Sequence, residues 1–187
     1  MGNYHFAVHQ NYSGNALDIT KAYSKAIGST KICAFLSTFK EETETDLFGE
    51  QVILTGGIPK IIQSSYKVLL ESGYSPAVSW LVCYYELKTI VDMFHSKGFD
   101  FMNQAISDTA EYGGMRESDR LLNDEFRDEM RSALKLIQSG EFHREWKEET
   151  KNGYKHLKNL REKQQESPIN DLTKKMLEAL KNKANEE

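Results

Sequence analysis

The segment from residue 77 to residue 96 is the feature that most constrains the fold of this chain. It follows Ser75 and Pro76, and proline is favourable at the first position of a helix because its missing N–H has no helical acceptor there. Apolar side chains recur on nearly every side of a helix drawn through this segment. Such a helix has to be buried on most sides, so other elements must pack around it. Its apolar positions are Val78, Trp80, Leu81, Val82, Tyr84, Leu87, Ile90, Val91 and Phe94.

Helical periodicity also dominates the rest of the chain and predicts an all-α domain of about seven to nine helices. Two short apolar segments stand apart. Residues 4–8 are expected to be extended, and residues 32–35 have the pattern of either a strand or a helix. Further helices are expected over residues 17–27, 46–54, 59–72, 101–112, 119–138 and 142–160, with a last one from Ser167 and Pro168.

Glycines mark several expected helix ends. Gly28 follows one helix, capped at its start by Ser13 or Asn15, and Gly140 separates the two long helices of the C-terminal half. The glycine pairs at 56–57 and 113–114 are expected to end the helices before them. The last helix runs into the sequence KNKANEE, so residues 173–187 are expected to be a frayed tail of a single domain spanning 1–187.

Composition excludes several classes of function. The 187 residues are 39% hydrophobic and 28% charged, with no apolar run near the ~18 residues of a membrane span and no visible secretory signal. The formal charge of −4 provides no attraction for nucleic acid. Cys33 and Cys83 lie in apolar surroundings without metal-type spacing, so reduced thiols are favoured over a disulfide. A cytoplasmic protein that binds neither membrane nor nucleic acid is expected.

The stretch from Thr38 to Gln51, TFKEETETDLFGEQ, contains the first candidate for chemistry. Asp46 and Glu50 are four residues apart, and on a helix this spacing places both carboxylates on one face, one turn apart. Adjacent carboxylates repel, so they are stable at an exposed surface or around a cation. Ligands that are all oxygen suit Mg²⁺ or Mn²⁺. By spacing alone, a solvated surface remains the more common explanation.

Two further polar positions are ambiguous from the residues alone. Glu86 and Lys88 lie inside the apolar segment 77–96, where an unpaired buried charge would be costly. An ion pair or partial exposure would explain them without any function. Ser107 carries little information by itself, because helix serines are usually solvated or bonded to the preceding turn.

Several segments together resemble the ketol-acid reductoisomerases, the enzymes of branched-chain amino acid biosynthesis. The acidic stretch at 38–51 resembles the metal-site segment of that family, and the similarity runs in the family's order from about residue 7 to about residue 172. The other matching segments are His9, Gln10, Tyr12, Gly14 and Ala16–Asp18 (HQ-Y-G-ALD), Glu86–Asp92 (ELK-IVD), Ile106–Gly113 (ISDTAEYG) and Gln138–Phe142 (QSGEF).

The resemblance implies a fold and a site. In that family the C-terminal domain is a knotted helical bundle, so we expect a homodimer whose intertwined subunits share their sites. By match to the family's pattern, Asp46 would bridge two Mg²⁺ ions and Glu50 would bind one. Glu86 and Ser107 would come from the partner subunit to contact metal-bound water and substrate, making Glu86 both a metal-site and a catalytic residue.

Two departures from the family's pattern bear on activity. The sequence contains no dinucleotide fingerprint, so it provides no pocket for NADPH. One turn before Glu86 the family has another metal-binding glutamate, and this chain has Val82, which offers no oxygen. Tyr85 and Thr55 also replace residues common in the family.

Three hypotheses follow. The chain is an enzyme that retains part of the metal site, with one or two ions, for chemistry on a small 2-hydroxy or 2-oxo acid. Alternatively, it is one part of a split reductoisomerase whose NADPH is supplied by a separate Rossmann-domain protein. The third hypothesis is a non-catalytic dimerisation subunit that pairs with itself or with a full-length homologue.

Overall fold

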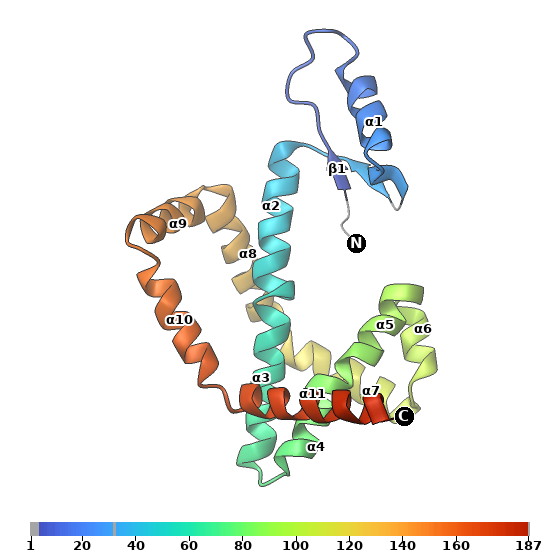
Figure 1. The fold of residues 1–187 in the computed structure, drawn as a ribbon, viewed down its shortest axis with the longest axis vertical. Helices are drawn as coiled ribbons and strands as arrows, with labels where there is room; N and C mark the ends of the chain where they lie inside the picture. Colours follow the sequence, from blue (N-terminus) through green and yellow to red (C-terminus); the bar gives the residue numbers. More distant parts are fainter. Residues whose placement is uncertain (1–3, 32, 187) are drawn as a thin grey trace.

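The structure is a computed structural model that describes residues 4–31 and 33–186, and it is all-α apart from one small sheet (Figure 1). The shorter elements are β1 (Tyr4–Phe6), β2 (Ala34–Leu36), the 3-10 helix η1 (Ser29–Lys31) and the π-helical segments η2 (Glu50–Leu54) and η3 (Leu81–Tyr85). The α-helices are α1 (Ala16–Ala26), α2 (Phe39–Gly49), α3 (Gly57–Glu71), α4 (Pro76–Trp80), α5 (Leu87–Lys97), α6 (Phe99–Ala105), α7 (Asp108–Leu121), α8 (Asp124–Gln138), α9 (Glu141–Lys151), α10 (Lys155–Gln165) and α11 (Pro168–Glu186).

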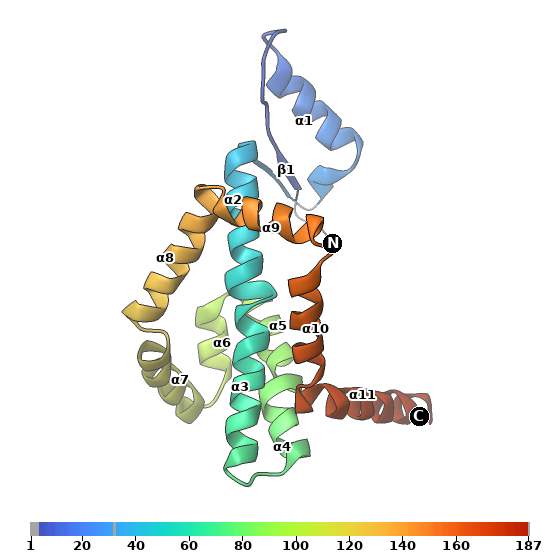
Figure 2. The same ribbon diagram turned by 90° about the vertical axis from the view of Figure 1, so that its left-hand side faces the viewer.

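The N-terminal residues form a small unit at one end of the molecule. Strands β1 and β2 pair in parallel, with His5 opposite Phe35, and α1 lies in the connection between them. Figures 1 and 2 both show this unit beyond the start of α2. The extended conformation expected at the N-terminus is confirmed by β1. The second apolar run is a strand over 34–36, and Ile32 lies outside the described residues.

A long column formed by α2, η2 and α3 runs through the molecule (Figures 1 and 2). Thr38 caps α2, because its hydroxyl accepts a hydrogen bond of 3.0 Å from the Glu41 N–H. The glycine pair at 56–57 joins the two helices where the backbone comes very close. A Cβ at Gly56 would lie 2.0 Å from the Gln51 carbonyl oxygen, and one at Gly57 equally close to that of Val52. Only glycine fits at these two positions.

The core lies where α3, α4 and α11 meet. Tyr66, Trp80 and Ile169 are its buried centre, and Figure 1 shows α11 crossing α4 at this place. The Trp80 indole Nε1 donates a hydrogen bond of 2.8 Å to the Thr173 hydroxyl, so the polar atom of the buried ring is satisfied. Partly buried side chains pack around this centre: Ile62, Leu70, Cys83, Leu172 and Met176.

The segment 77–96 differs from its prediction in two ways. It is divided into α4 and α5 by the π-helical η3, and most of its apolar side chains are not buried within the chain. Trp80 and Ser79 are almost completely buried, whereas Val78 is 57% exposed and Val82 is 48% exposed. The reason is that the elements of one chain cover only one side of this helix.

Three of the expected helix boundaries in the C-terminal half were wrong. The predicted helix 101–112 is broken before Asp108, and Gly113 and Gly114 lie inside α7 and do not end it. The predicted helix 119–138 is divided at Asn123, which caps α8. The predicted helix 142–160 is divided at Gly153 and Tyr154, both with a positive φ. These divisions give eleven α-helices in the described residues, more than the seven to nine expected.

The C-terminal segment is also more regular than expected. Helix α11 begins at Pro168 as predicted, but it continues to Glu186 through the segment expected to be frayed. None of the helices in the described ranges combines the length and the apolar composition that a bilayer span requires.

Candidate metal site

Asp46 and Glu50 lie on successive turns where α2 passes into η2. The Glu50 N–H donates to the Asp46 carbonyl, which holds the two residues in helical register. The Glu50 carbonyl accepts hydrogen bonds from the Thr55 N–H (2.8 Å) and the Thr55 hydroxyl (2.9 Å). The backbone of Glu50 is therefore fixed from both sides, while its side chain and that of Asp46 are exposed.

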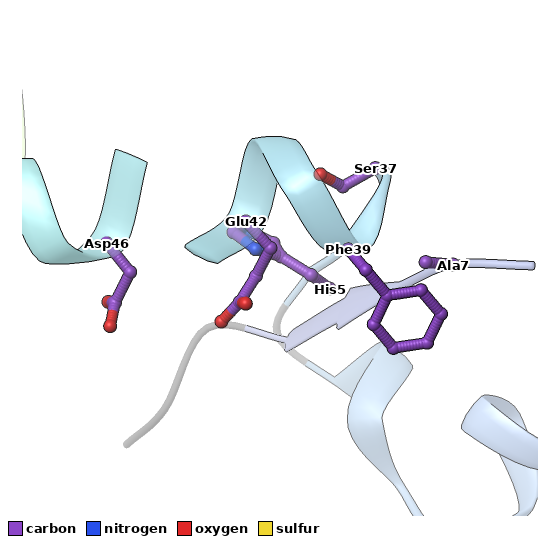
Figure 3. A pocket seen from close by; sticks show the side chains of 6 residues that line it. All are labelled: His5, Ala7, Ser37, Phe39, Glu42 and Asp46. Atoms are coloured by element: carbon purple, nitrogen blue, oxygen red, sulfur yellow. The ribbon is translucent and has the colours of Figure 1, made fainter. Parts of the chain in front are cut away.

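A cavity of about 460 Å³ lies beside Asp46, between α2 and the N-terminal unit. Figure 3 shows the carboxylates of Glu42 and Asp46 extending from the same side of α2. Glu42 is four residues before Asp46, so Glu42, Asp46 and Glu50 form one row along the helix. Glu50 does not line this cavity. The residues that do are His5, Ala7, Ser37, Phe39, Glu42 and Asp46.

Glu42 is a candidate that the sequence analysis missed. The signal was present, because its spacing from Asp46 is the same four residues that singled out Glu50. In the described ranges, no Lys, Arg or His forms an ion pair with any of these three carboxylates. Uncompensated carboxylates at this spacing repel one another, and a hard dication with oxygen ligands would remove the repulsion. The donor set fits Mg²⁺ or Mn²⁺ in chemical type.

Glu86 lies at the end of the second π-helical segment. Its N–H donates to the Leu81 carbonyl (3.0 Å), and its own carbonyl accepts from the Thr89 N–H (3.0 Å). The side chain of Glu86 is exposed, and Lys88 forms an ion pair with Asp92. Both polar residues of this apolar segment are thus explained within one chain by exposure or pairing.

Ser107 caps helix α7. Its backbone is extended (φ −71°, ψ 148°), and its Oγ accepts a hydrogen bond of 3.3 Å from the Ala110 N–H. This bond uses one lone pair of the oxygen and leaves the hydroxyl proton available for donation to another group.

The two π-helical segments coincide with the two halves of the predicted site. Glu50 begins η2, and Glu86 directly follows η3. Single π-turns inside α-helices are rare and are frequent at functional sites, because they turn side chains away from the regular helical positions. This observation singles out Glu50 and Glu86 independently of the motif.

The positions that differ from the family's pattern have structural roles of their own. Thr55 closes η2 through its bond to the Glu50 carbonyl. Tyr85 stacks on Trp80 with 5.3 Å between the ring centroids, and Tyr84 stacks on the same indole at 5.5 Å. Val82 lies in η3 and is half exposed. Burial raises the pKa of the neighbouring Cys83 thiol, which disfavours the thiolate form that would bind a metal.

One chain does not bring the predicted residues together. Among the side chains that the structure describes, those of residues 5–31 and 33–182, no three His, Cys, Asp or Glu groups are close enough to hold a common ion. Asp46 and Glu50 are adjacent on α2 and η2, but Glu86 and Ser107 belong to another part of the chain (Figure 1).

Comparison with known proteins decides the family. The family model for the C-terminal domain of ketol-acid reductoisomerase matches residues 39–182. The chain belongs to the ketol-acid reductoisomerase family. This confirms the resemblance drawn from the motifs, and it covers the segments that carry Asp46, Glu50, Glu86 and Ser107.

Relatives in the family match most of this chain, but the match covers only part of each relative's own length. The ketol-acid reductoisomerase (NADP(+)) of Chloroherpeton thalassium is 44% identical over 170 residues, which are 91% of this chain and 50% of the relative. The ketol-acid reductoisomerase (NADP(+)) of Methanocaldococcus jannaschii is 43% identical, and the match covers 91% of this chain and 52% of the relative. A solved structure, an NADH-preferring ketol-acid reductoisomerase from an uncultured archean, matches with a TM-score of 0.87 and 37% sequence identity. The match covers 93% of this chain and 53% of that structure's chain. The chain therefore spans about half the length of these reductoisomerases, and it shares the fold of the solved structure over that half.

Proposed function

We propose that two copies of this chain form an intertwined, knotted homodimer with a shared magnesium site, and that this site acts on a small acid of the acetohydroxy acid type. The observation that carries the proposal is the row of uncompensated carboxylates Glu42, Asp46 and Glu50 on one helix face. Family membership supports the kind of chemistry, a reductoisomerase-related step of branched-chain amino acid biosynthesis.

Each site residue has a proposed role. Asp46 and Glu50 would hold the ion or ions. Glu86 and Ser107 would come from the partner subunit, where Glu86 would complete the metal site and the Ser107 hydroxyl would donate a hydrogen bond to the substrate. A bound Mg²⁺ or Mn²⁺ would polarise the ketone and stabilise negative charge that develops on its oxygen.

The exposed apolar side chains support the dimer. The faces of α4 and η3 that other elements of the chain leave open contain large apolar groups such as Val78, Leu81 and Tyr85. Apolar surface of this extent usually marks an interaction surface. A second copy that covers these faces would bring its own α2 close to Glu86.

Reduction would require a Rossmann domain outside these 187 residues, because they contain no dinucleotide fingerprint. In one form of this proposal, a separate Rossmann-domain protein supplies the NADPH. In that case the chain is one part of a split reductoisomerase, and without the partner it is limited to the isomerisation step.

Val82 favours an alternative function. It is half exposed on η3, one turn before Glu86, where a second metal ion would need a carboxylate. A chain without this ligand, whose 187 residues contain no dinucleotide fingerprint, fits a non-catalytic subunit that dimerises with itself or with a full-length reductoisomerase.

Calorimetric titration of the metal-free protein with Mn²⁺ and Mg²⁺ tests the proposal. Asp46→Asn should abolish saturable binding, because the variant loses the bridging carboxylate. Asp171→Asn, at an exposed position of α11, makes the same change in charge away from the site and should bind like the wild type. If the wild type binds neither ion at millimolar concentration, the metal-dependent function is wrong and the dimerisation subunit is favoured.

A further inference from the structure

A second cavity lies far from the candidate metal site and is lined by cationic and hydroxyl groups. It has a volume of about 420 Å³ and lies between α3 and the junction of α10 with α11. Figures 1 and 2 both show the end of α10 and the start of α11 beside α3. Its lining residues include no Asp or Glu; those that bear on the argument are Lys60, Ser64, Tyr66, Lys67, Lys163 and Ser167.

The lysines of this cavity are incompletely neutralised. Lys60 and Lys163 form no ion pair with any residue that the structure describes. Lys67 is paired with Glu71 at 3.6 Å, in an exposed pair that contributes little. Like charges around one cavity repel, and an anion bound between them would reverse the sign of this interaction.

Tyr66 provides the most specific evidence. Its side chain is only 3% exposed, and its hydroxyl makes no hydrogen bond within the described part of the chain. This hydroxyl is not among the fully buried polar atoms that lack a partner, so it opens onto the cavity, where it can donate a hydrogen bond to a bound group. Burial also raises the pKa of Tyr66, which keeps the hydroxyl protonated and able to donate.

The junction of α10 with α11 forms another wall of the cavity, and hydrogen bonds hold its backbone in place. Ser167 precedes Pro168, the first residue of the 19-residue helix α11. The Ser167 carbonyl accepts from the Asn170 N–H (3.0 Å), and the Asn170 side-chain amide donates to the Gln164 carbonyl (2.6 Å). The backbone at Ser167 is therefore fixed at the N-terminus of α11, the positive end of its helix dipole, which favours a negative ligand.

We infer that this cavity binds a small dianion, of the phosphate-ester or dicarboxylate class, between Lys60, Lys163 and the Tyr66 hydroxyl. The site is separate from the row of carboxylates on α2, so the ligand would be an effector or a second substrate group. Lysine ammonium groups are compact point charges that suit such an oxyanion, and the hydroxyls of Ser64 and Ser167 complete its coordination.

Binding of inorganic phosphate to the metal-free protein at low ionic strength tests this inference without reference to the metal site. The double variant Lys60→Met/Lys163→Met should weaken phosphate binding at least about tenfold, because charge-assisted hydrogen bonds are lost. Lys158→Met, on the same helix as Lys163 but outside the cavity, is the control for charge and should bind like the wild type. Equal affinity in the double variant and this control, or no phosphate binding by the wild type, would overturn the inference.

Two further measurements make the test specific. Tyr66→Phe retains the buried ring and removes only the hydroxyl, so it should weaken binding several-fold with unchanged helical circular dichroism. Unchanged affinity in this variant would overturn the role of the hydroxyl. Comparing phosphate with malonate identifies the class of ligand, since tighter phosphate binding favours a phosphate ester and tighter malonate binding a dicarboxylate.

Discussion

At the scale of single residues, Trp80 connects the core to the candidate site. Its indole packs between α3 and α11, its Nε1 is bonded to Thr173, and its face carries Tyr84 and Tyr85 of the π-helical segment before Glu86. The position of Glu86 therefore depends on a buried side chain one and a half turns earlier.

Loss of the bond to Trp80 should destabilise the protein. Thr173→Val keeps the shape of the side chain but leaves the indole N–H without an acceptor in a buried position. We expect the free energy of unfolding to fall by about 1–3 kcal/mol. Thr45→Val replaces an exposed threonine on α2 and should change it by less than about 0.5 kcal/mol. Urea denaturation of both variants measures the difference, and equal effects would contradict the assigned role of Thr173.

Val82 is the residue that decides how many ions the proposed site can hold. Val82→Glu adds a carboxylate one turn before Glu86 at a half-exposed position, so the substitution should fold and should raise the number of Mn²⁺ ions bound per chain. Val68→Glu places the same group at an exposed position of α3 and should leave the number unchanged. Identical stoichiometry in the two variants would mean that residue 82 does not face the metal.

At the scale of elements, the helices could be predicted from the sequence but many of their ends could not. Periodicity locates a helix wherever apolar residues face a core, and α3, α8 and the start of α11 follow it. It fails at Ser107 and Asn123, because apolar residues continue in helical spacing across both positions. Serine and asparagine are common enough inside helices that neither one identifies a cap without the backbone.

The cap at Ser107 has a cost in stability that can be separated from any role in binding. Ser107→Ala removes the acceptor for the Ala110 N–H and should lower the free energy of unfolding by about 1 kcal/mol. Ser65→Ala, at an exposed position inside α3, removes no cap and should be neutral or slightly stabilising. Thermal denaturation distinguishes them. If the two variants are equally stable, Ser107 does not cap α7.

Only part of the candidate site could be predicted, because spacing along the sequence places residues on one helix but does not show where the helix changes. Asp46 and Glu50 share one helix, so their four-residue spacing was enough to place them together. The π-helical segments that position Glu50 and Glu86 could not be predicted, because the sequence has no signal for one extra residue in a helical turn. Glu42 was missed although its spacing was visible, since the surrounding acidic residues made it look like ordinary solvated surface.

At the scale of the whole molecule, the single chain leaves its most apolar segment half covered. The prediction that residues 77–96 are buried rests on a sound physical rule, but the rule does not say which chain provides the cover. Within one chain, α11 and α3 cover Trp80 and leave Val78, Val82 and Tyr85 in solvent. The proposed intertwined dimer would cover these side chains, and it would also account for the lack of a complete metal cluster among the described residues of one chain.

Mn²⁺ binding by a mixed dimer tests the shared site most directly. Asp46→Asn and Glu86→Gln chains, each with a different tag, would be co-expressed, and the dimer carrying both tags would be purified and titrated. We predict no saturable binding by either variant alone and one restored site per mixed dimer, because the intact Asp46 of one chain meets the intact Glu86 of the other. A mixed dimer that binds no more Mn²⁺ than the separate variants would contradict a site shared between subunits.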